Sequence, residues 1–311
     1  MELRRLGALQ VGVVGLGCNN FGMTIDQERT TAVVDAALAA GVTYFDTAES
    51  YGKGQSEEFL GKALGARRAD VLVATKWGHT MSLEPNQRGG DPALMRSCLE
   101  ASLRRLGMDY VDHYQLHSHD PATPAEETLG ALAELQAEGK IREIGCTTFS
   151  AQQLTEAATA ATAKGVAPYA SIQNHFSLLT RDPDRDGVLD TCGKLDVAFV
   201  PYFPLESGLL TGKYHAGEPL PDGTRLKNWG KRAARFIDDD KLRSVAALSD
   251  WAAGHGHSLL DLAMSWLVSE PKIATVIAGC TSAAQVTANV AAASAWAMTS
   301  AERAEAASIA G

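Results

Sequence analysis

The sequence has few cysteines and none at the spacing of a disulfide or metal motif. Its five cysteines are scattered, odd in number, and no two of them form a CxxC pair. Small secreted domains usually carry an even set of closely spaced cysteines, whereas reduced thiols are usual in the cytosol. The cysteines therefore exclude a disulfide scaffold and predict a cytoplasmic protein.

An excess of positive charge and long apolar runs are also missing. The 311 residues carry a formal net charge of -9 and no basic stripe, so no nucleic-acid partner is expected. No apolar run is long enough to span a bilayer, and residues 1–7 lack the apolar core of a signal peptide, so no membrane partner is expected. Because no linker, charge block or repeat divides the sequence, residues 1–311 are predicted to form a single domain.

Short apolar runs alternate with longer amphipathic segments along the chain. Strands are predicted at 13–17, 42–46, 71–76, 110–117, 141–147, 170–174, 197–202 and 274–278. Helices are predicted at 27–40, 56–64, 91–106, 124–138, 151–164, around 186–195, and at 238–254, 258–268 and 282–292. Eight strand–helix units in about 300 residues predict an α/β fold, a (β/α)8 TIM barrel with its active site at the carboxyl ends of the strands.

Three further segments lie outside this alternation. Residues 3–6 and 9–11 are predicted to form an N-terminal β-hairpin that closes the bottom of the barrel. Residues 299–309 are predicted to form an additional C-terminal helix. The segment 204–235 is rich in Gly and Pro and is predicted to be a loop longer than a connection needs.

Four polar side chains follow or end predicted strands. Asp46 and Lys76 stand at two strand tips, Tyr51 lies five residues after Asp46, and His117 ends another strand. A buried carboxylate needs a cation, and a tyrosine, whose pKa is normally about 10, can transfer a proton more easily near a cation. We therefore expect Asp46 to keep Lys76 protonated and Lys76 to lower the pKa of Tyr51.

Around these residues the sequence resembles the aldo-keto reductase family. The resemblance rests on "FDTAESYGKGQSEEFLGKAL", "ATKWG", "DYVDHYQLH" and "SGLLTGKY", and it runs from Leu3 to about Asn289. It implies an NADP(H)-dependent oxidoreductase that reduces aldehydes or ketones to alcohols, or runs in reverse, on a small-molecule substrate. Its catalytic residues would be Asp46, Tyr51, Lys76 and His117. Tyr51 would be the general acid or base and His117 would orient the carbonyl oxygen.

The chain lacks the GxGxxG fingerprint of a Rossmann dinucleotide site. Glycines occur within residues 12–17, but that segment is itself a predicted strand. In a barrel, late loops and helix N-termini bind phosphate instead. The cofactor contacts that the resemblance implies are Thr147, Thr148, Gln173, Tyr202, Leu205, Ser207, Leu209, Lys213, Gly279, Thr281, Gln285 and Asn289.

The resemblance also divides these contacts among parts of the cofactor. Gln173, followed by Asn174, would hold the nicotinamide carboxamide, and Tyr202 would stack on the nicotinamide ring. The segment 205–213 would cover the pyrophosphate, and the segment 279–289 would hold the adenosine end.

The sequence departs from the family pattern at two places. After the fifth strand it has "GCTTF", with Thr148 in place of an asparagine, where the family usually has "GxSNF". Thr281 stands where many relatives place a cation for the 2′-phosphate, and no basic residue occurs between Lys272 and Arg303. NADPH is the expected cofactor on the family's habit, and NADH stays possible.

Aromatic residues near the strand ends are candidates for the substrate pocket. Phe21, Trp77 and Trp229 could form an apolar wall, although Trp77 could equally pack beneath a loop. The sequence specifies neither which carbonyl compound is bound nor whether the chain self-associates.

Other functions were weighed against this one. His113, His117 and His119 could in principle bind zinc, but no other strand end offers a histidine. We therefore expect no metal, and we expect His113 to pack in the barrel interior. "GLLTGKY" is also similar to potassium-channel β-subunits, so a nicotinamide-binding, redox-sensing regulatory subunit is an alternative. A Schiff-base lyase using Lys76 is disfavoured because that lysine would have to be neutral beside Asp46.

Overall fold

The computed structural model describes residues 1–215, 217–235 and 237–311, without the side chains of residues 229, 232, 234 and 235. No helix among the described residues is long and apolar enough to cross a membrane.

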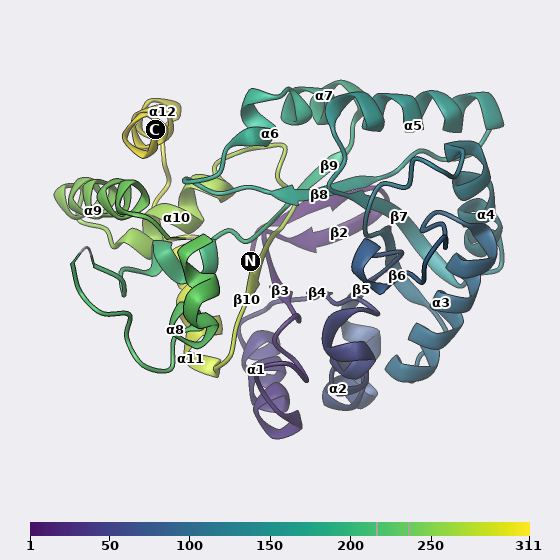
Figure 1. Cartoon of the computed structure of the whole chain (residues 1–311), viewed down its shortest axis with the longest axis horizontal. Coiled ribbons are helices and arrows are strands. Elements are labelled where there is room, and N and C mark those ends of the chain that lie inside the picture. The colour runs from purple at the N-terminus through teal and green to yellow at the C-terminus, as the bar shows by residue number, and fades with distance from the viewer. Residues whose placement is uncertain (216, 236) are drawn as a thin grey trace.

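Eight parallel strands form one sheet that curls into a nearly closed barrel (Figure 1). The strands are β3 (Val14–Gly17), β4 (Tyr44–Asp46), β5 (Leu72–Trp77), β6 (Val111–Leu116), β7 (Ile141–Thr147), β8 (Ser171–His175), β9 (Ala198–Tyr202) and β10 (Val276–Gly279). Their order in the sheet is β10-β3-β4-β5-β6-β7-β8-β9. The seam between β9 and β10 is bridged at Phe199 and Ile273. The predicted (β/α)8 fold is confirmed.

Helices follow the strands and surround them in chain order (Figure 1). They are α1 (Gln27–Ala39), α2 (Gln55–Leu64), α3 (Pro92–Leu106), α4 (Ala125–Ala137), α5 (Ala151–Lys164), α6 (Asp182–Arg185), α7 (Val188–Leu195), α8 (Arg225–Trp229), α9 (Asp239–Gly254), α10 (Leu259–Val268), α11 (Ala283–Ala292) and α12 (Ser300–Ala310). These segments form helices because their sequences combine polar capping residues with an apolar face. Ser150 and Ser258, for example, begin α5 and α10 with capping boxes.

The hairpin of β1 (Leu3–Leu6) and β2 (Leu9–Gly12) covers the end of the barrel where the strands begin. Its apolar residues Leu6, Leu9 and Val11 pack in one buried cluster with Tyr44, Val200 and other strand residues. The predicted hairpin and the additional C-terminal helix are thus both confirmed, and the bottom of the barrel is filled.

Most predicted bounds differ from the observed ones by one or two residues: β4, for example, begins at Tyr44 instead of residue 42, and β10 begins at Val276 instead of residue 274. Three other differences concern the segment 186–195, the segment 204–235 and the start of α2. The segment expected as one helix around 186–195 is two short helices, α6 and α7, because Gly187 between them has a left-handed backbone. The segment 204–235 contains a 3₁₀ helix at Glu206–Thr211 as well as α8. Helix α2 begins one residue before Ser56, whose hydroxyl instead donates to the Cys18 carbonyl oxygen.

Arg4 connects the hairpin to the far end of the chain. Its guanidinium donates to the carbonyl oxygens of Val268, Glu270 and Ile273, at 2.7, 3.1 and 2.7 Å. Arg4→Met leaves these part-buried carbonyls without their donor and should lower the free energy of unfolding by about 1–3 kcal/mol in a urea titration. Arg5→Met is the control: it removes only the exposed pair with Asp196 and should change stability little. Equal losses for the two variants would contradict this role of Arg4.

Candidate active site

Two polar layers fill the upper part of the barrel interior. Side chains two residues apart on a strand point to the same face, so β4, β6 and β8 each supply one residue to both layers, and β5 adds Lys76 to the upper layer. The lower layer holds Tyr44, His113 and Ser171, all buried. The upper layer holds Asp46, Lys76, Gln115 and Gln173, on β4, β5, β6 and β8.

Asp46 and Lys76 form a fully buried ion pair in the upper layer. Lys76 Nζ lies 2.5 Å from Asp46 Oδ2 and donates to the Thr47 carbonyl oxygen at 2.9 Å. The side chain of Lys76 is 0% exposed and that of Asp46 is 5% exposed. Burial lowers the pKa of Lys76, but Asp46 and Tyr51 raise it by more, so the pKa lies above its usual value. Lys76 is therefore a cation at neutral pH.

Tyr51 lies directly over this ion pair, in a 3₁₀ turn, Tyr51–Gly54, that follows β4. Lys76 Nζ donates to Tyr51 Oη at 3.5 Å and lies 5.1 Å from the centre of its ring. The expected lowering of the Tyr51 pKa is not found. Burial raises this pKa, Lys76 lowers it, Asp46 raises it again, and the result lies above the ordinary value.

His117 stands beside Tyr51, immediately after β6. The ring centroids of Tyr51 and His117 are 5.8 Å apart in an edge-to-face arrangement. Burial, with Lys76 and His79, holds the pKa of His117 well below its usual value, so the imidazole is neutral. Its Nδ1 is buried and has no hydrogen-bond partner among the described residues.

His79, which the sequence gave no reason to single out, also lies at this site. Its ring is 4.6 Å from the ring of His117, centroid to centroid, and its Nδ1 accepts from the Met81 backbone N–H. Burial and the nearby Lys76 lower its pKa. His79 follows Trp77 by only two residues, but no local pattern marks it, because its contact with His117 arises from the packing of two loops.

Two of the residues expected to form an apolar pocket wall are buried beneath the surface. Phe21 and Trp77 are both 0% exposed. The Trp77 indole N–H donates to the Gly89 carbonyl oxygen at 3.0 Å, and its ring stacks on Tyr114 at 4.4 Å. Trp77 therefore packs beneath the loop after β5, the alternative left open by the sequence. The side chain of Trp229 lies outside the described residues.

The residues expected at the nicotinamide carboxamide lie at the ends of β7 and β8. Thr147 is buried and its hydroxyl donates to the His117 carbonyl oxygen. Thr148 is exposed and has a left-handed backbone, with φ of 59°. Gln173 is buried, 3.2 Å from Asp46 Oδ1 through its amide nitrogen. Asn174 donates to the Phe149 carbonyl oxygen, and its own Oδ1 is buried without a partner among the described residues.

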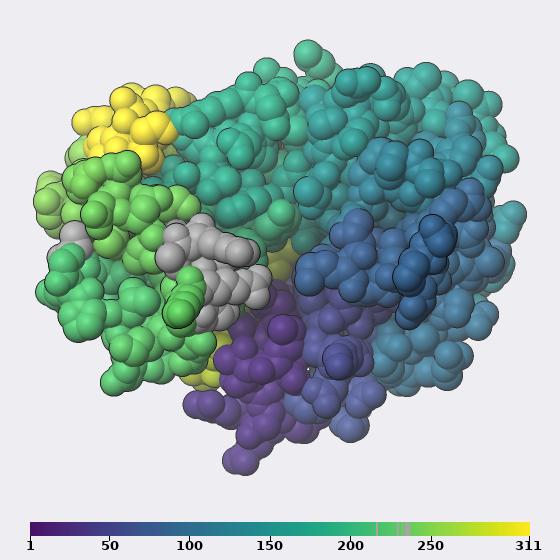
Figure 2. Space-filling model, in the orientation of Figure 1, coloured from purple at the N-terminus to yellow at the C-terminus, as the bar shows by residue number. Residues whose placement is uncertain are grey.

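The segment after β9 faces the segments after β5 and β6 across a hollow near the centre of Figure 2. At its start, Tyr202 is half-buried and stacks on His175, with ring centroids 5.5 Å apart. His175 Nε2 lies 2.7 Å from Glu206 Oε1, which fixes the turn that follows. In that turn Ser207 has a left-handed backbone, Leu205 is partly buried and Leu209 is buried in the main core.

Two cations without acidic partners lie farther along this segment. Burial lowers the pKa of Lys213, and nearby Arg225 lowers it further; burial also lowers the pKa of Arg225. Neither is paired with a carboxylate in the described part of the chain. Arg225 Nη2 instead donates to Asn20 Oδ1 at 2.9 Å, and Asn20 Nδ2 donates to the Cys280 carbonyl oxygen at 3.2 Å. Asn20 thus places Arg225 against the end of β10.

The residues expected around the adenosine lie beside these cations. Gly279 ends β10, and a side chain there would lie 2.8 Å from Asn19 Oδ1, so the backbone is close to that loop. Gln285 Oε1 accepts from the Thr281 backbone N–H at 2.8 Å, at the start of α11. Asn289 is buried and donates to Cys280 Sγ at 3.3 Å. Sequence reasoning missed Arg225, since it lies in an aperiodic segment and meets β10 only in the folded chain.

Partly buried cations without acids are sites for an anion. Lys213 and Arg225, together with the unpartnered Asn174 Oδ1 and His117 Nδ1, therefore fit a ligand that carries phosphates at one end and hydrogen-bonding groups at the other. A phosphorylated nicotinamide dinucleotide has this chemistry.

Of the three histidines weighed as zinc ligands, His113 and His119 have hydrogen-bond partners of their own. His113 Nδ1 is 2.8 Å from Tyr44 Oη and its Nε2 is 3.0 Å from Ser171 Oγ, deep in the barrel. Burial lowers the pKa of His113 to about 3. His119 Nδ1 pairs with the Gln153 amide. A fourth histidine, His175, ends β8, so the expectation that no other strand end offers a histidine is wrong. No group of three metal-ligating side chains converges in the part of the chain that the structure describes.

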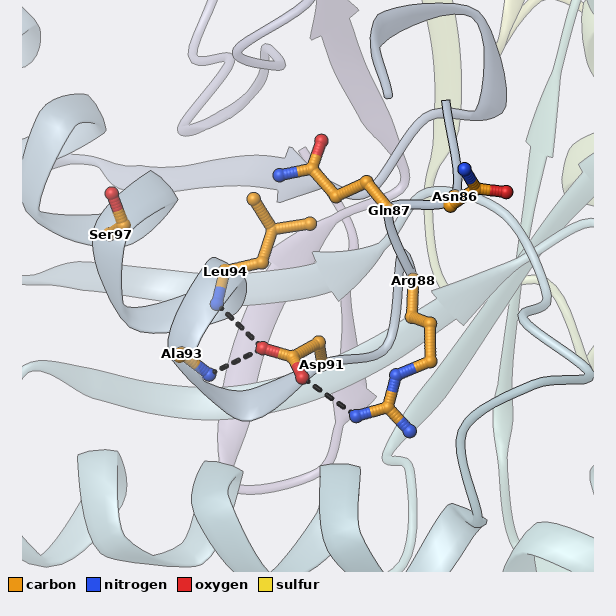
Figure 3. A pocket seen from close by; sticks show the side chains of 7 residues that line it. All are labelled: Asn86, Gln87, Arg88, Asp91, Ala93, Leu94 and Ser97. Carbon is orange, nitrogen blue, oxygen red and sulfur yellow. Dashed lines mark hydrogen bonds and ion pairs between the residues drawn. The ribbon is translucent and has the colours of Figure 1, made fainter. Parts of the chain in front are cut away.

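A separate pocket of about 480 Å³ lies at the start of α3 (Figure 3). Its lining residues are Asn86, Gln87, Arg88, Asp91, Ala93, Leu94 and Ser97. Asp91 caps α3 by accepting from the Ala93 and Leu94 backbone N–H groups, and it pairs with Arg88. None of the catalytic candidates lines this pocket, and its charged groups pair with each other.

Comparisons with known proteins agree with this geometry. The sequence profile described as "Aldo/keto reductase family" matches residues 13–310. The chain is 36% identical to a probable voltage-gated potassium channel subunit beta of Oryza sativa, over 93% of this chain and 90% of that protein. It is 32% identical to an L-glyceraldehyde 3-phosphate reductase of Escherichia coli O157:H7, over 92% and 84% of the two chains.

The structure is likewise similar to that of aldo-keto reductase AKR11C1 from Bacillus halodurans in its holo form. The TM-score is 0.81 at 30% identity, over 100% of this chain and 97% of that chain. The chain belongs to the aldo/keto reductase family of carbonyl-reducing oxidoreductases.

Proposed function

We propose that the protein reduces aldehydes or ketones to alcohols, or catalyses the reverse reaction, with NADPH as cofactor and Tyr51 as the general acid or base. The observation that carries this proposal is the bridge formed by Lys76, which bonds to Asp46 Oδ2 and to Tyr51 Oη. The five cysteines are free thiols, which supports work in the cytoplasm.

Each residue of the site has a distinct task in this reaction. Because Lys76 donates to Tyr51 Oη, the phenolic O–H is left to point at a substrate carbonyl oxygen. Neutral His117 bonds to the same oxygen and orients it. NADPH, when bound, supplies the hydride to the carbonyl carbon. As the C=O π bond breaks, the carbonyl carbon gains a C–H bond from the hydride, and the carbonyl oxygen gains an O–H bond from the proton that Tyr51 gives up.

Different parts of the cofactor would contact different residues around the open end of the barrel. Gln173, Asn174 and Tyr202 would hold the nicotinamide, Lys213 the pyrophosphate, and Thr281, Gln285 and Asn289 the adenosine. The direct test is equilibrium titration of the purified protein with NADPH and with NADH, followed by a screen of aldehydes and ketones. Tight NADPH binding with turnover of a carbonyl compound is the expected result. Binding of neither cofactor would contradict the proposal.

Arg225 is the residue that we expect to select NADPH over NADH. A hydrogen bond to a charged group contributes about 1.5–3 kcal/mol, so Arg225→Met should weaken NADPH binding by roughly 10–100-fold. NADH binding should be unchanged, and the salt dependence of NADPH binding should decrease. The matched control is Arg243→Met, which removes an exposed arginine of α9 that pairs with Asp240. A loss of NADH affinity equal to that of NADPH would contradict a role specific to the 2′-phosphate.

A nicotinamide-binding regulatory subunit is the second candidate. The 36% identity to a rice protein named as a probable potassium channel subunit beta favours it. This role predicts a tetramer that retains its cofactor and turns over carbonyl compounds slowly. Light scattering and single-turnover kinetics on the same preparation distinguish it from the first proposal.

A further inference from the structure

Glu206 is a buried carboxylate, in the turn after β9, that the proposed reaction does not use. Its side chain is 6% exposed, and its Oε1 lies 2.7 Å from His175 Nε2 and accepts from Ser177 Oγ at 2.6 Å. Burial raises the pKa of Glu206, but its hydrogen bonds, above all that with His175, lower the pKa by more, so it lies below its usual value. Glu206 is therefore an anion at neutral pH. Because an ionised carboxylate only accepts hydrogen bonds, His175 Nε2 carries the proton between the two side chains.

The turn that contains Glu206 has a strained backbone. Phe203, Glu206, Ser207 and Gly208 are all left-handed, with φ of 53°, 47°, 57° and 96°. Only the last is a glycine, and other residues adopt this conformation rarely. Such strain persists where the surrounding structure holds it, and it is common at sites that bind ligands. The carboxylate of Glu206 connects this strained turn to β8 through His175.

His175 in turn supports the ring of Tyr202. The two residues are partners in the register of β8 and β9, and their rings stack with centroids 5.5 Å apart and planes 19° apart. Phe203 meets both rings edge-on, 5.5 Å from His175 and 5.4 Å from Tyr202. The Tyr202 hydroxyl makes no hydrogen bond to the residues that the structure describes, so packing against His175 and Phe203 sets the plane of its ring. The imidazole itself has Glu206 as its one hydrogen-bond partner in the described part of the chain.

We infer that His175 and Glu206 are positioning residues: Glu206 fixes the imidazole of His175, and the imidazole supports one face of Tyr202 so that the other face can stack on a flat ring of a bound molecule. The matching ligand group is a planar aromatic ring, because aromatic rings prefer offset stacking. The inference rests on the proposed function only for the identity of that ring, which would be the nicotinamide of the cofactor.

The test compares NADP⁺ with 2′-phospho-ADP-ribose, which has the same phosphates and adenosine but no nicotinamide. Calorimetric titration of the wild-type protein should show tighter binding of NADP⁺. The preference for NADP⁺, taken as the ratio of the two dissociation constants, should fall about 2–10-fold in His175→Ala, because one supported ring stack contributes about that much. It should also fall in Glu206→Leu, because the imidazole is then free to turn away from Tyr202.

Ser177→Ala is the matched control, because it removes the other hydrogen bond to Glu206 Oε1 and leaves that with His175 in place. Its ratio should equal the wild-type ratio even if its thermal stability falls. An unchanged ratio in His175→Ala or in Glu206→Leu, or an equal fall in Ser177→Ala, would overturn the inference. Equal binding of the two ligands by the wild-type protein would also overturn it, whether or not a variant folds. Binding of neither ligand would instead contradict the proposed function, and the inference with it.

Discussion

Tyr51→Phe is expected to reduce the rate of carbonyl reduction by about 10²–10⁴-fold, the usual contribution of a positioned general acid. The phenyl ring keeps the contact with His117, while the group that donates the proton is lost. NADPH affinity should stay close to that of the wild type, because the cations expected to bind phosphate are on the segment after β9. Stopped-flow single-turnover measurements at saturating NADPH check the rate of reduction, and a parallel titration with NADPH checks the affinity.

The pH dependence gives a second test of the same residue. Burial raises the pKa of Tyr51, so its acid form persists to higher pH than that of a free tyrosine. A proton donor is competent below its pKa. Reduction should therefore be level through neutral pH and decline only above about pH 10. The reverse reaction needs the base form and should accelerate as the pH rises. Full activity of Tyr51→Phe, or a decline of reduction between pH 6 and 8, would exclude Tyr51 as the acid.

The barrel and the ion pair could be predicted because both depend on local sequence. Eight short apolar runs separated by helical segments allow few arrangements other than a barrel. Asp46 and Lys76 stand at two neighbouring strand tips, so the barrel itself brings them together. The role of Trp77 was left open because its neighbours alone do not show whether a loop covers its ring.

The remaining features of the site depend on distances across the barrel that no local pattern encodes. Arg225 meets Asn20 although 205 residues separate them. The pKa of Tyr51 was expected to fall because the sequence shows a nearby cation, but it does not show how far burial opposes that cation. Gln115 gives no sequence signal either, since an amide inside a strand is notable only when its partners are known.

Lys76→Met is expected to abolish activity and to lower the free energy of unfolding by about 3–5 kcal/mol, because it leaves the Asp46 carboxylate buried without its cation. Both side chains are almost fully inaccessible, so water cannot replace the lost partner. Asp46→Leu alone should be similarly damaging, since it leaves the Lys76 ammonium unpaired.

The double variant Asp46→Leu/Lys76→Met separates stability from catalysis. It removes both charges, and well-packed apolar replacements of a buried ion pair are often neutral for stability. Urea titration should therefore show a smaller loss for the double variant than for either single variant, a coupling of the kind expected for contacting residues. Carbonyl reduction should stay abolished in Lys76→Met and in the double variant, because Tyr51 Oη has lost the cation that bonds to it. If the losses of stability simply added, the two side chains would not act as a pair. If activity returned with stability, Lys76 would serve the fold and not the proton transfer.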